Sequence, residues 1–491
     1  MTDRLGLSAG LAADVSLPDY QRDNHGVGIV HFGMGAFHKA HQAVYTDDAL
    51  AASGGDWRIA GVSLRSAAPA QELMPQSCLY TVIERNAEGA SARVIGSIAA
   101  ALCLRTDRWP VLETLCAPET KIVSMTVTET GYGIDRNTGG VDPSCPVIAA
   151  DLADPSSPCG VAGLLVWALG RRRAAGTPPF TILSCDNLPQ NGALTRSLLI
   201  DFARRATPDL VEHIAIDVAF PSTMVDRITP ARTDATLKLA EQLIGQADAA
   251  AIECETFRQW VIEDHFPTER PCWEAGGALF TDDVRPYEEM KLRMLNGTHS
   301  MIAYAGFLAG HRTVREAMED HDLSALAARH LAAAAATLGP VPSVDLDEYA
   351  ADLMVRFANP HLAHETGQIA MDGSQKMPQR LFAPALDAIT RGQCCKPFAF
   401  AAAVWIRYMR GRFDDGQPYD IRDPRSGELA ILMRGQASAD DLIGRIRSVN
   451  GLVPPELAAN DRWNDAVRTE LSHMLTSGMR ASIQRAASRA A

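Results

Sequence analysis

The spacing of apolar residues in the first part of the chain predicts strands that alternate with helices. The β-branched run Val27–Phe32 stops at Gly33, and a helical spacing of apolar residues begins at Ala36. Strands that alternate with helices in this way are typical of a parallel sheet with crossover helices. Further strands are predicted at Trp57–Leu64, Leu79–Glu84, Ala92–Ile98, Lys121–Thr128 and Pro179–Cys185, with a helical stretch at Asp151–Gly176.

The pattern changes after about residue 282, where strand candidates become few. Alanine-rich helical segments follow at His321–Leu338, Leu381–Ile389, Phe398–Arg410, Ser438–Val449 and Asn464–Ala491. We therefore predict an α/β domain over residues 1–282 and a mainly α-helical domain over residues 283–491. The segment Met371–Arg380 is predicted to be a loop that holds Lys376, because Gly373 and Pro378 interrupt it.

The segment Pro286–His299 is predicted to be a helix that carries several polar groups. At about 100° per residue, Lys291 and His299 fall on one stripe, with Glu288 one turn earlier and Asn296 at the edge of that face. A lysine on a mostly buried face has a lowered pKa unless it is paired, and a neutral lysine can act as a general base. The alternative interpretation is a lysine at the surface and a histidine in the core.

Gly33 and Gly35 form a G-x-G pair between the first predicted strand and the first predicted helix. In that context the first glycine permits a tight turn, and the second lets the backbone approach a pyrophosphate at the helix N-terminus. His38 stands where the usual third glycine would be, so an accidental turn explains the motif equally well. Phe37, in the same segment, is included among the predicted cofactor contacts.

The ends of two later strands provide further candidate cofactor contacts. Arg65 and Ser66 follow Trp57–Leu64, where an NAD site normally has a carboxylate for the ribose hydroxyls. Because no acid stands at that point, the loop would tolerate the 2′-phosphate of a dinucleotide. Glu129 follows Lys121–Thr128 at the edge where ligand contacts are expected, although a simple loop acid explains it equally well.

Two other polar residues stand directly after apolar runs. Asn187 follows a predicted strand, and its structural alternative is a turn-forming asparagine that caps a helix beginning near Ala193. Two prolines bracket Asp226 and Arg227 in the segment Phe220–Pro230. Asp226 is a candidate cofactor contact, and a surface ion pair between the two residues is the alternative.

The charge and the cysteine content narrow the classes of partner. The chain has 59 acidic and 46 basic residues, a formal charge of −13, and no basic run longer than Arg171–Arg173, which argues against nucleic acid and anionic membranes. The 10 cysteines form no C-x-x-C pair, so free thiols in a reducing cytoplasm are expected. No apolar run reaches the ~18–20 residues that a membrane span needs, and the absence of a sustained heptad pattern favours a monomer.

Seven blocks follow one another between about residue 26 and residue 380: GIVHFGMGAFHKAHQAVY, TVTETGYGID, SCDNLPQNG, FPSTMVDRITP, RQWVIEDHF, PYEEMKLRMLNGTH and MDGSQKMPQR. Together they resemble the mannitol dehydrogenase family of long-chain polyol-specific dehydrogenases, which includes mannitol 2-dehydrogenase and fructuronate reductase. The resemblance implies a Rossmann-type dinucleotide-binding domain followed by a mainly α-helical domain. It also implies a nicotinamide cofactor, predicted to be NAD with NADP as an alternative, a sugar alcohol or sugar acid as substrate, and no metal.

The resemblance also implies roles for individual residues. Lys291 resembles the general base of the family, Asn187 and Asn296 its paired oxyanion-hole amides, His299 and Lys376 its contacts to substrate hydroxyls, and Glu288 a carboxylate that gates proton exit. Fixed amide donors suit this chemistry because an alkoxide develops as hydride leaves the carbon. A neutral lysine then accepts the hydroxyl proton without help from a metal.

Some positions depart from the family pattern and leave the substrate open. Ala67 and Ala68 stand where NAD-specific mannitol enzymes have acids, and Gln368 stands where such enzymes can have an arginine near the substrate. The block MDGSQKMPQR resembles the fructuronate reductase branch, whereas Ser156–Arg196 resembles the mannitol branch. D-mannitol/D-fructose and D-mannonate/D-fructuronate are therefore both candidate substrate pairs, and a carboxylate substrate needs an additional cation. A catalytically silent dinucleotide-binding sensor is the alternative of another class.

Overall fold

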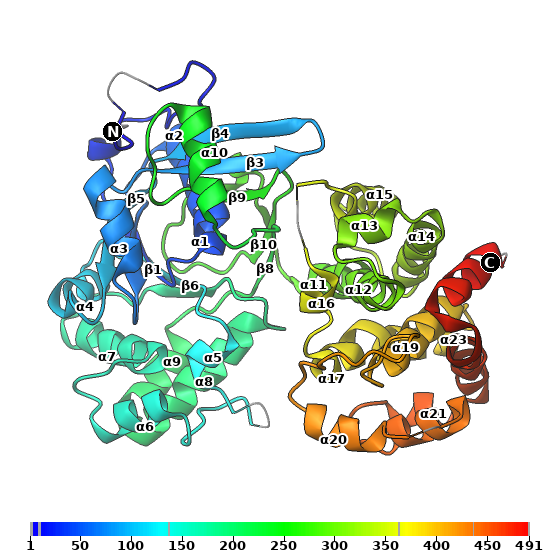
Figure 1. Cartoon of the computed structure of the whole chain (residues 1–491). Helices are drawn as coiled ribbons and strands as arrows, with labels where there is room; N and C mark the ends of the chain where they lie inside the picture. Colours follow the sequence, from blue (N-terminus) through cyan, green and yellow to red (C-terminus); the bar gives the residue numbers. More distant parts are fainter. Residues whose placement is uncertain (1–2, 8–10, 136–137, 362–363, 436, 490–491) are drawn as a thin grey trace. The chain divides into compact units, whose positions relative to one another are not determined.

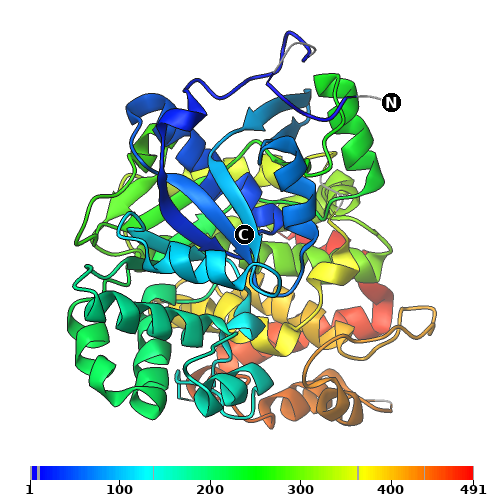
Figure 2. The same ribbon diagram turned by 90° about the vertical axis from the view of Figure 1, so that its left-hand side faces the viewer.

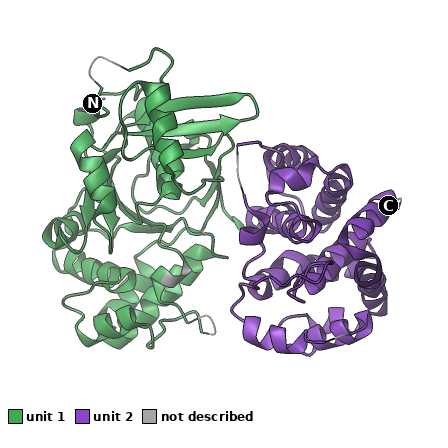
Figure 3. Cartoon of the chain, in the orientation of Figure 1, with its two compact units in different colours: residues 1–285 green, residues 286–491 purple. Residues whose placement is uncertain are grey.

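The chain forms two compact units. The structure is a computed structural model that describes residues 3–7, 11–135, 138–361, 364–435 and 437–489 (Figure 1). Unit 1 comprises Met1–Arg285 and unit 2 comprises Pro286–Ala491 (Figure 3). The boundary that the sequence suggests, after residue 282, lies close to this division.

Unit 1 is built on a five-stranded sheet in the order β5-β2-β1-β6-β7, in which every neighbouring pair is parallel. The strands are β1 (Val27–Phe32), β2 (Arg58–Ser63), β5 (Ile98–Cys103), β6 (Ile122–Met125) and β7 (Thr181–Ser184). Figure 2 shows the blue strands of this unit side by side. The strand order reverses at β1, which is the position where ligands bind in doubly wound sheets. The predicted Rossmann-type domain is confirmed.

Both faces of this sheet are buried, which explains why its strands read as continuous apolar runs. Side chains alternate between the two faces of a strand. Val30 of β1 therefore packs in one core with Leu165 and Leu198, whereas Ile29 packs in a second core with Val44 and Trp260. The helices of unit 1 are α1 (Ala36–Ala40), α2 (Gln42–Ser53), α3 (Ala68–Leu73), α4 (Arg108–Cys116), α5 (Glu129–Tyr132), α6 (Pro146–Ala153), α7 (Val161–Ala174), α8 (Asn191–Ala206), α9 (Val211–Ile216) and α10 (Asp234–Ile244), with the short 3-10 helices η1 (Arg22–Asn24), η2 (Met74–Gln76), η3 (Pro208–Leu210) and η4 (Trp273–Gly276).

The predicted strand Ala92–Ile98 is wrong, because two different strands share that segment. β4 (Gly89–Ile95) pairs antiparallel with β3 (Tyr80–Asn86), and β5 starts at Ile98 in the large sheet. The chain turns between them because Gly96 donates its N–H to Asp47 and Ser97 donates its hydroxyl to the Ala43 carbonyl, both on α2. Figure 1 shows the β3–β4 hairpin beside α10. The two smaller sheets have the orders β4-β3-β9 and β11-β10-β8, with β8 (Thr223–Asp226), β9 (Ile252–Glu255), β10 (Gln259–Glu263) and β11 (Leu279–Thr281).

Unit 2 is mainly helical within its described residues, as the sequence predicts. α19 lies at its centre, because every side chain from Phe398 to Tyr408 is buried. Within the described residues of the whole chain, none of the helices combines the length and apolar character that a membrane crossing requires. The elements are α11 (Arg285–Met290), η5 (Lys291–Gly297), α12 (Thr298–Ala309), α13 (Val314–Glu319), α14 (His321–Ala336), α15 (Leu346–Phe357), α16 (Thr366–Ile369), α17 (Gly373–Met377), η6 (Pro378–Phe382), α18 (Ala383–Thr390), α19 (Lys396–Tyr408), α20 (Ser426–Leu432), α21 (Ala439–Arg447), α22 (Pro455–Ala458) and α23 (Asp461–Ser488).

Candidate active site

A cavity of about 550 Å³ in unit 1 opens at the carboxyl ends of β1, β2 and β6. Its lining includes Gly33 and Gly35 after β1, Arg65 and Ser66 after β2, and Thr128 after β6. Four of the predicted cofactor contacts thus line one cavity. This edge of a doubly wound sheet is where a dinucleotide is expected.

Different structural features explain why glycine stands at each of the two positions of the G-x-G pair. Gly33 has φ +103°, and a Cβ there would stand 2.1 Å from the Thr126 carbonyl oxygen, so no larger residue fits. A Cβ on Gly35 would meet no described atom within 4 Å outside its chain neighbours, although Gly35 lines the cavity. The open space beside Gly35 is therefore space for a ligand, and a bound pyrophosphate fits it.

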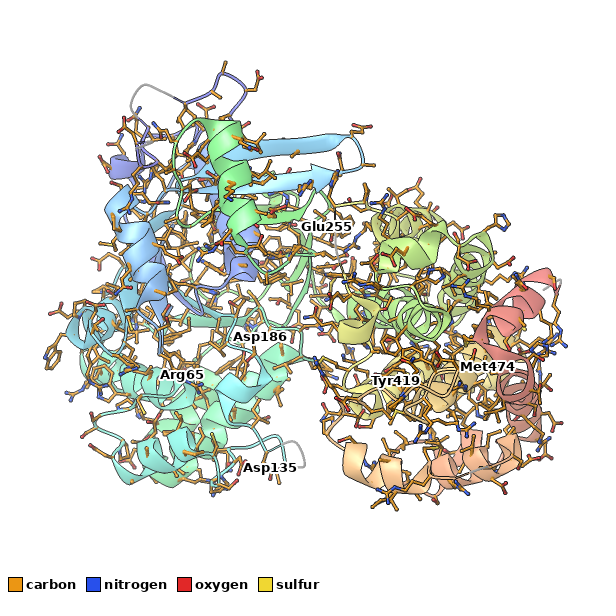
Figure 4. The ribbon with its side chains drawn as sticks, viewed as in Figure 1. Arg65, Asp135, Asp186, Glu255, Tyr419 and Met474 are labelled. Atoms are coloured by element: carbon orange, nitrogen blue, oxygen red, sulfur yellow. The ribbon has the colours of Figure 1, made fainter. Side chains whose placement is uncertain are left out.

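The cavity wall next to β2 is cationic. Arg65 and Arg105 both line it, and no carboxylate is among the described lining residues. Figure 4 labels Arg65 in this part of unit 1. Arg105 follows β5 and was missed by the sequence analysis, because that strand was not recognised. Ser66 also accepts the N–H of Ala68 with its hydroxyl at 3.2 Å, which fixes the start of α3.

Asp186 organises the loop after β6. Its carboxylate accepts the N–H groups of Val127 at 2.9 Å and Thr128 at 3.0 Å, and the hydroxyl of Tyr132 at 2.9 Å. Thr128 is thereby held at φ +65°, a backbone conformation that is strained for a β-branched residue. Figure 4 labels Asp186. Glu129 begins α5 in this loop, and its side chain lies outside the described part of the structure.

Asn187 is exposed in unit 1, three residues after the end of β7, and it is not the N-cap of the next helix. α8 begins at Asn191 instead of near Ala193, and its N-cap residue, Gln190, makes no side-chain capping bond. The asparagine that holds this turn is the buried Asn191, which donates to the Asp186 carbonyl and accepts the Thr223 N–H. Asn187 is therefore not the N-cap of α8.

Asp226 ends β8 and is buried, and it does not line the cavity. A surface ion pair between Asp226 and Arg227 is the wrong interpretation. The Arg227 side chain is buried, pairs with Glu84, and donates to the Ala40 carbonyl. Phe37 on α1 is half-buried and stacks on His41 with ring centroids 4.9 Å apart, so it contributes to the core beside the cofactor loop.

His38 stands at the position of the third glycine of the dinucleotide motif, and its ring makes a stacking contact. Its ring stacks on His31 of β1 with centroids 3.5 Å apart and an interplanar angle of 13°. The stacked ring pair fills the space between strand and helix at the point where a glycine would leave no side chain. Burial lowers the pKa of His31 to about 3 and that of His38 well below its usual value, so both rings are neutral near pH 7.

In unit 2, Lys291 and Asn296 lie on a π-helix, η5, between the α-helical α11 and α12. The predicted α-helical spacing is wrong for this segment. Hydrogen bonds in a π-helix join residues five apart, so Lys291 and Asn296 are neighbours on one face. Lys291 is buried, with 8 % of its surface exposed, and Glu288 is half-buried one turn earlier. The basic amine of Lys291 and the amide of Asn296 therefore belong to the same face of η5.

A second π-helix, η6, packs against η5, and the predicted loop Met371–Arg380 is therefore helical. Gly297 permits the contact, because a Cβ there would stand 2.9 Å from the Arg380 carbonyl oxygen. Arg380 donates from Nη1 to the Ser300 hydroxyl at 3.0 Å and to the Asn296 carbonyl at 3.4 Å. Pro378 and Gly373 did not end the helical structure here, because this packing compensates for their weak propensity. The sequence analysis did not assign Arg380 to the site.

His299 and Lys376 lie among cations. Burial lowers the pKa of His299 well below its usual value, and His364, Arg380, Arg356 and Lys376 add to this effect. His299 is therefore neutral near pH 7 and suits a hydrogen-bond role better than that of a base. Burial, followed by Arg380, also lowers the pKa of Lys376, whose ammonium donates to the Met371 carbonyl at 2.6 Å. Gln368 is exposed on α16.

Comparison with known proteins identifies the family. The model of the mannitol dehydrogenase Rossmann domain matches residues 27–275, and that of the mannitol dehydrogenase C-terminal domain matches residues 283–475. The chain belongs to the mannitol dehydrogenase family. It is an oxidoreductase, and the predicted family is confirmed.

Three relatives show how far the similarity extends. The uncharacterized oxidoreductase YeiQ of Escherichia coli (strain K12) is 42% identical over 94% of this chain and 94% of that protein. The D-mannonate oxidoreductase of the same organism is 39% identical over 95% of this chain and 97% of that protein. The Pseudomonas fluorescens mannitol 2-dehydrogenase, solved as a ternary complex with NAD and D-mannitol, has 37% identity and a TM-score of 0.84, and covers 98% of each chain.

Proposed function

We propose that this protein is a polyol or hexonate dehydrogenase that interconverts a secondary alcohol and a ketone with NAD or NADP. The observation that carries this proposal is η5, which places the buried Lys291 and the half-buried Asn296 on one face. A relative named D-mannonate oxidoreductase and a structure of mannitol 2-dehydrogenase with NAD and D-mannitol support it. D-mannitol/D-fructose and D-mannonate/D-fructuronate are the two candidate substrate pairs.

In the proposed reaction, Lys291 accepts the hydroxyl proton as the alcohol is oxidised, and Glu288 passes it toward water. Asn187 and Asn296 donate amide N–H groups to the developing alkoxide, which stabilises the charge without adding a competing base. His299 and Lys376 bind substrate hydroxyls, since neutral imidazole and ammonium groups are both donors. Gln368 is a further proposed substrate contact. No metal is assigned a role in this proposal.

The proposed cofactor site is the cavity after β1, β2 and β6. Gly33, Gly35, Arg65 and Ser66 would hold the dinucleotide, and the space beside Gly35 fits its pyrophosphate. When bound, the nicotinamide supplies the hydride acceptor for alcohol oxidation. Phe37, Glu129 and Asp226 remain proposed contacts, although Asp226 does not line this cavity. We also propose a monomeric, cytoplasmic protein; all ten cysteines are free thiols, which is compatible with a reducing compartment.

The proposed function is tested by following reduced-nicotinamide absorbance with D-fructose and with D-fructuronate, each with NADH and with NADPH. We expect turnover with at least one of the four combinations. Binding of NADH without turnover of either ketose would instead support the catalytically silent sensor.

The cofactor loop provides a second prediction. Replacing Ala67 and Ala68 together with aspartate should weaken NADPH binding by about tenfold or more, because both acids would repel a 2′-phosphate. NADH binding should change by less than about twofold, and acids at the N-terminus of α3 should not destabilise the helix. Fluorescence titration with each reduced cofactor measures this.

The control is the double variant Ala231→Asp and Ala235→Asp, which changes the net charge equally at two exposed positions outside the cavity. Unchanged NADPH affinity in the variant at Ala67 and Ala68 would show that this loop does not reach the ribose.

A further inference from the structure

Arg380 is a cation without a counter-ion in unit 2. It forms no ion pair with any residue in the described ranges, and its hydrogen bonds go to an uncharged hydroxyl and a carbonyl. Its neighbour Lys376 pairs with Asp372 at 3.9 Å, a distance too long for a strong pair, and Asp423 adds a weaker opposite influence. Two cations one helical turn apart therefore lack full compensation, although burial of an unpaired charge is unfavourable.

The electrostatics of this region agree with a missing anion. Burial lowers the pKa of Arg380 to about 10, and the only opposing influence is Tyr304. Arg380 also lowers the pKa of both Lys376 and His299, so the three groups are close enough to interact. An anionic group bound here would relieve all three unfavourable interactions at once.

The guanidinium has a free edge for such a group. Both hydrogen bonds of Arg380 to described residues are donated by Nη1. Nε and Nη2 are not among the described side-chain atoms that are both fully buried and without a hydrogen-bond partner. The pair of N–H groups on that edge matches the two oxygens of a carboxylate. The uncharged hydroxyls of a hexitol do not use this geometry and do not neutralise the charge.

We propose that Arg380, assisted by Lys376, binds the carboxylate of the substrate, so that this enzyme acts on a sugar acid in preference to a hexitol. The inference rests on the proposed function, because it assigns the substrate of the same site. In D-fructuronate the carboxylate lies at the opposite end of the carbon chain from the ketone. Lys291 and Asn296 on η5 can therefore bind the reacting end of the substrate. Arg380 on η6 and Lys376 on α17 bind its charged end.

Steady-state reduction of D-fructuronate and D-fructose by the full chain, with the better reduced cofactor at saturation, tests this inference. The wild type should have a kcat/KM at least about 100-fold higher with D-fructuronate. Arg380→Gln should raise the KM for D-fructuronate about 30- to 100-fold and change kcat little, whereas D-fructose kinetics should change less than about threefold. Arg380→Lys should recover part of the loss, because it keeps the charge but not the paired N–H groups.

Arg391→Gln is the matched control. Arg391 also donates to a backbone carbonyl in unit 2, that of Thr337, and has no assigned place in the site; this variant should behave as the wild type with both ketoses. Thermal melting of each variant shows whether it is folded. If Arg380→Gln melts early, D-mannonate should still raise the melting temperature of Arg380→Lys less than that of the wild type.

Three outcomes would overturn the inference. A wild type that prefers D-fructose would exclude a sugar acid as the substrate but leave the proposed dehydrogenase function intact. An equal loss of kcat with both ketoses in Arg380→Gln would show that Arg380 only positions η5 through the Asn296 carbonyl. Absence of turnover with either ketose would contradict the proposed function itself.

Discussion

Lys291→Ala is expected to lower kcat for alcohol oxidation by about a thousandfold or more, because it removes the group that accepts the hydroxyl proton. Cofactor affinity should change little, since Lys291 is proposed to act only on the transferred proton and does not line the dinucleotide cavity. Single-turnover and steady-state assays of hydride transfer, together with cofactor titration, measure both effects. Added primary amines should restore part of the oxidation rate.

The pH dependence distinguishes a base from a structural residue. Oxidation by the wild type should rise with pH, because only the neutral amine accepts a proton, and Lys291→Ala should lack this ionisation. Asn296→Ala and Asn187→Ala should lower kcat but keep the ionisation, because an amide does not titrate.

Lys396→Ala is the matched control, since Lys396 is an exposed lysine of the same unit at the start of α19. Near-normal turnover of Lys291→Ala, or an unchanged pH profile, would contradict the assignment. His299 would not be a convincing replacement, because its pKa is held well below the usual value by burial and neighbouring cations.

Gly35→Val is expected to weaken NAD binding by about 100-fold or more while leaving the fold intact. The side chain would enter the cavity, because a Cβ at this position meets no described atom within 4 Å outside its chain neighbours. The backbone at Gly35 has φ −81° and ψ 177°, an extended conformation that valine adopts without strain. Calorimetric titration and thermal melting measure the two effects.

Two other glycine variants serve as controls for Gly35→Val. Gly33→Ala should instead destabilise the protein by about 2 kcal/mol or more, because Gly33 has φ +103° and its Cβ would clash with the Thr126 carbonyl oxygen. Gly339→Val should change neither property, because Gly339 has open space around it and does not line the cavity. Full NAD affinity in Gly35→Val would show that the pyrophosphate does not bind beside this glycine.

Local sequence patterns predicted most of the elements in the parallel sheet. The β-branched runs at β1, β2, β6 and β7 are apolar on both faces because both faces are covered, so each run is visible without any knowledge of its neighbours. The change to helical spacing after residue 282 likewise predicted the helical unit. The chemistry of a buried lysine followed by an amide and an imidazole was equally visible between Lys291 and His299.

Strand partners could not be predicted from the same patterns. The apolar run at the end of β4 continues into β5, but hydrogen bonds from Gly96 and Ser97 to α2 hold a turn between the two strands. Arg105 was missed as a consequence, because it reaches the cavity only after β5 has joined β2. Sheet order is decided by contacts between segments far apart in sequence, and a local window contains no information about them.

The sequence by itself determined the strand, glycine turn and helix of the cofactor loop, the two-unit organisation and the residue types of the proposed site. Tertiary structure alone decided that η5 is a π-helix, that His38 packs flat on His31, and that Arg380 lies against Asn296. The physical reason is that a π-helix is rare and needs contacts outside its own segment, and here η5 packs against η6 at Gly297. Side chains such as Arg380 acquire their role from the neighbours that this packing supplies.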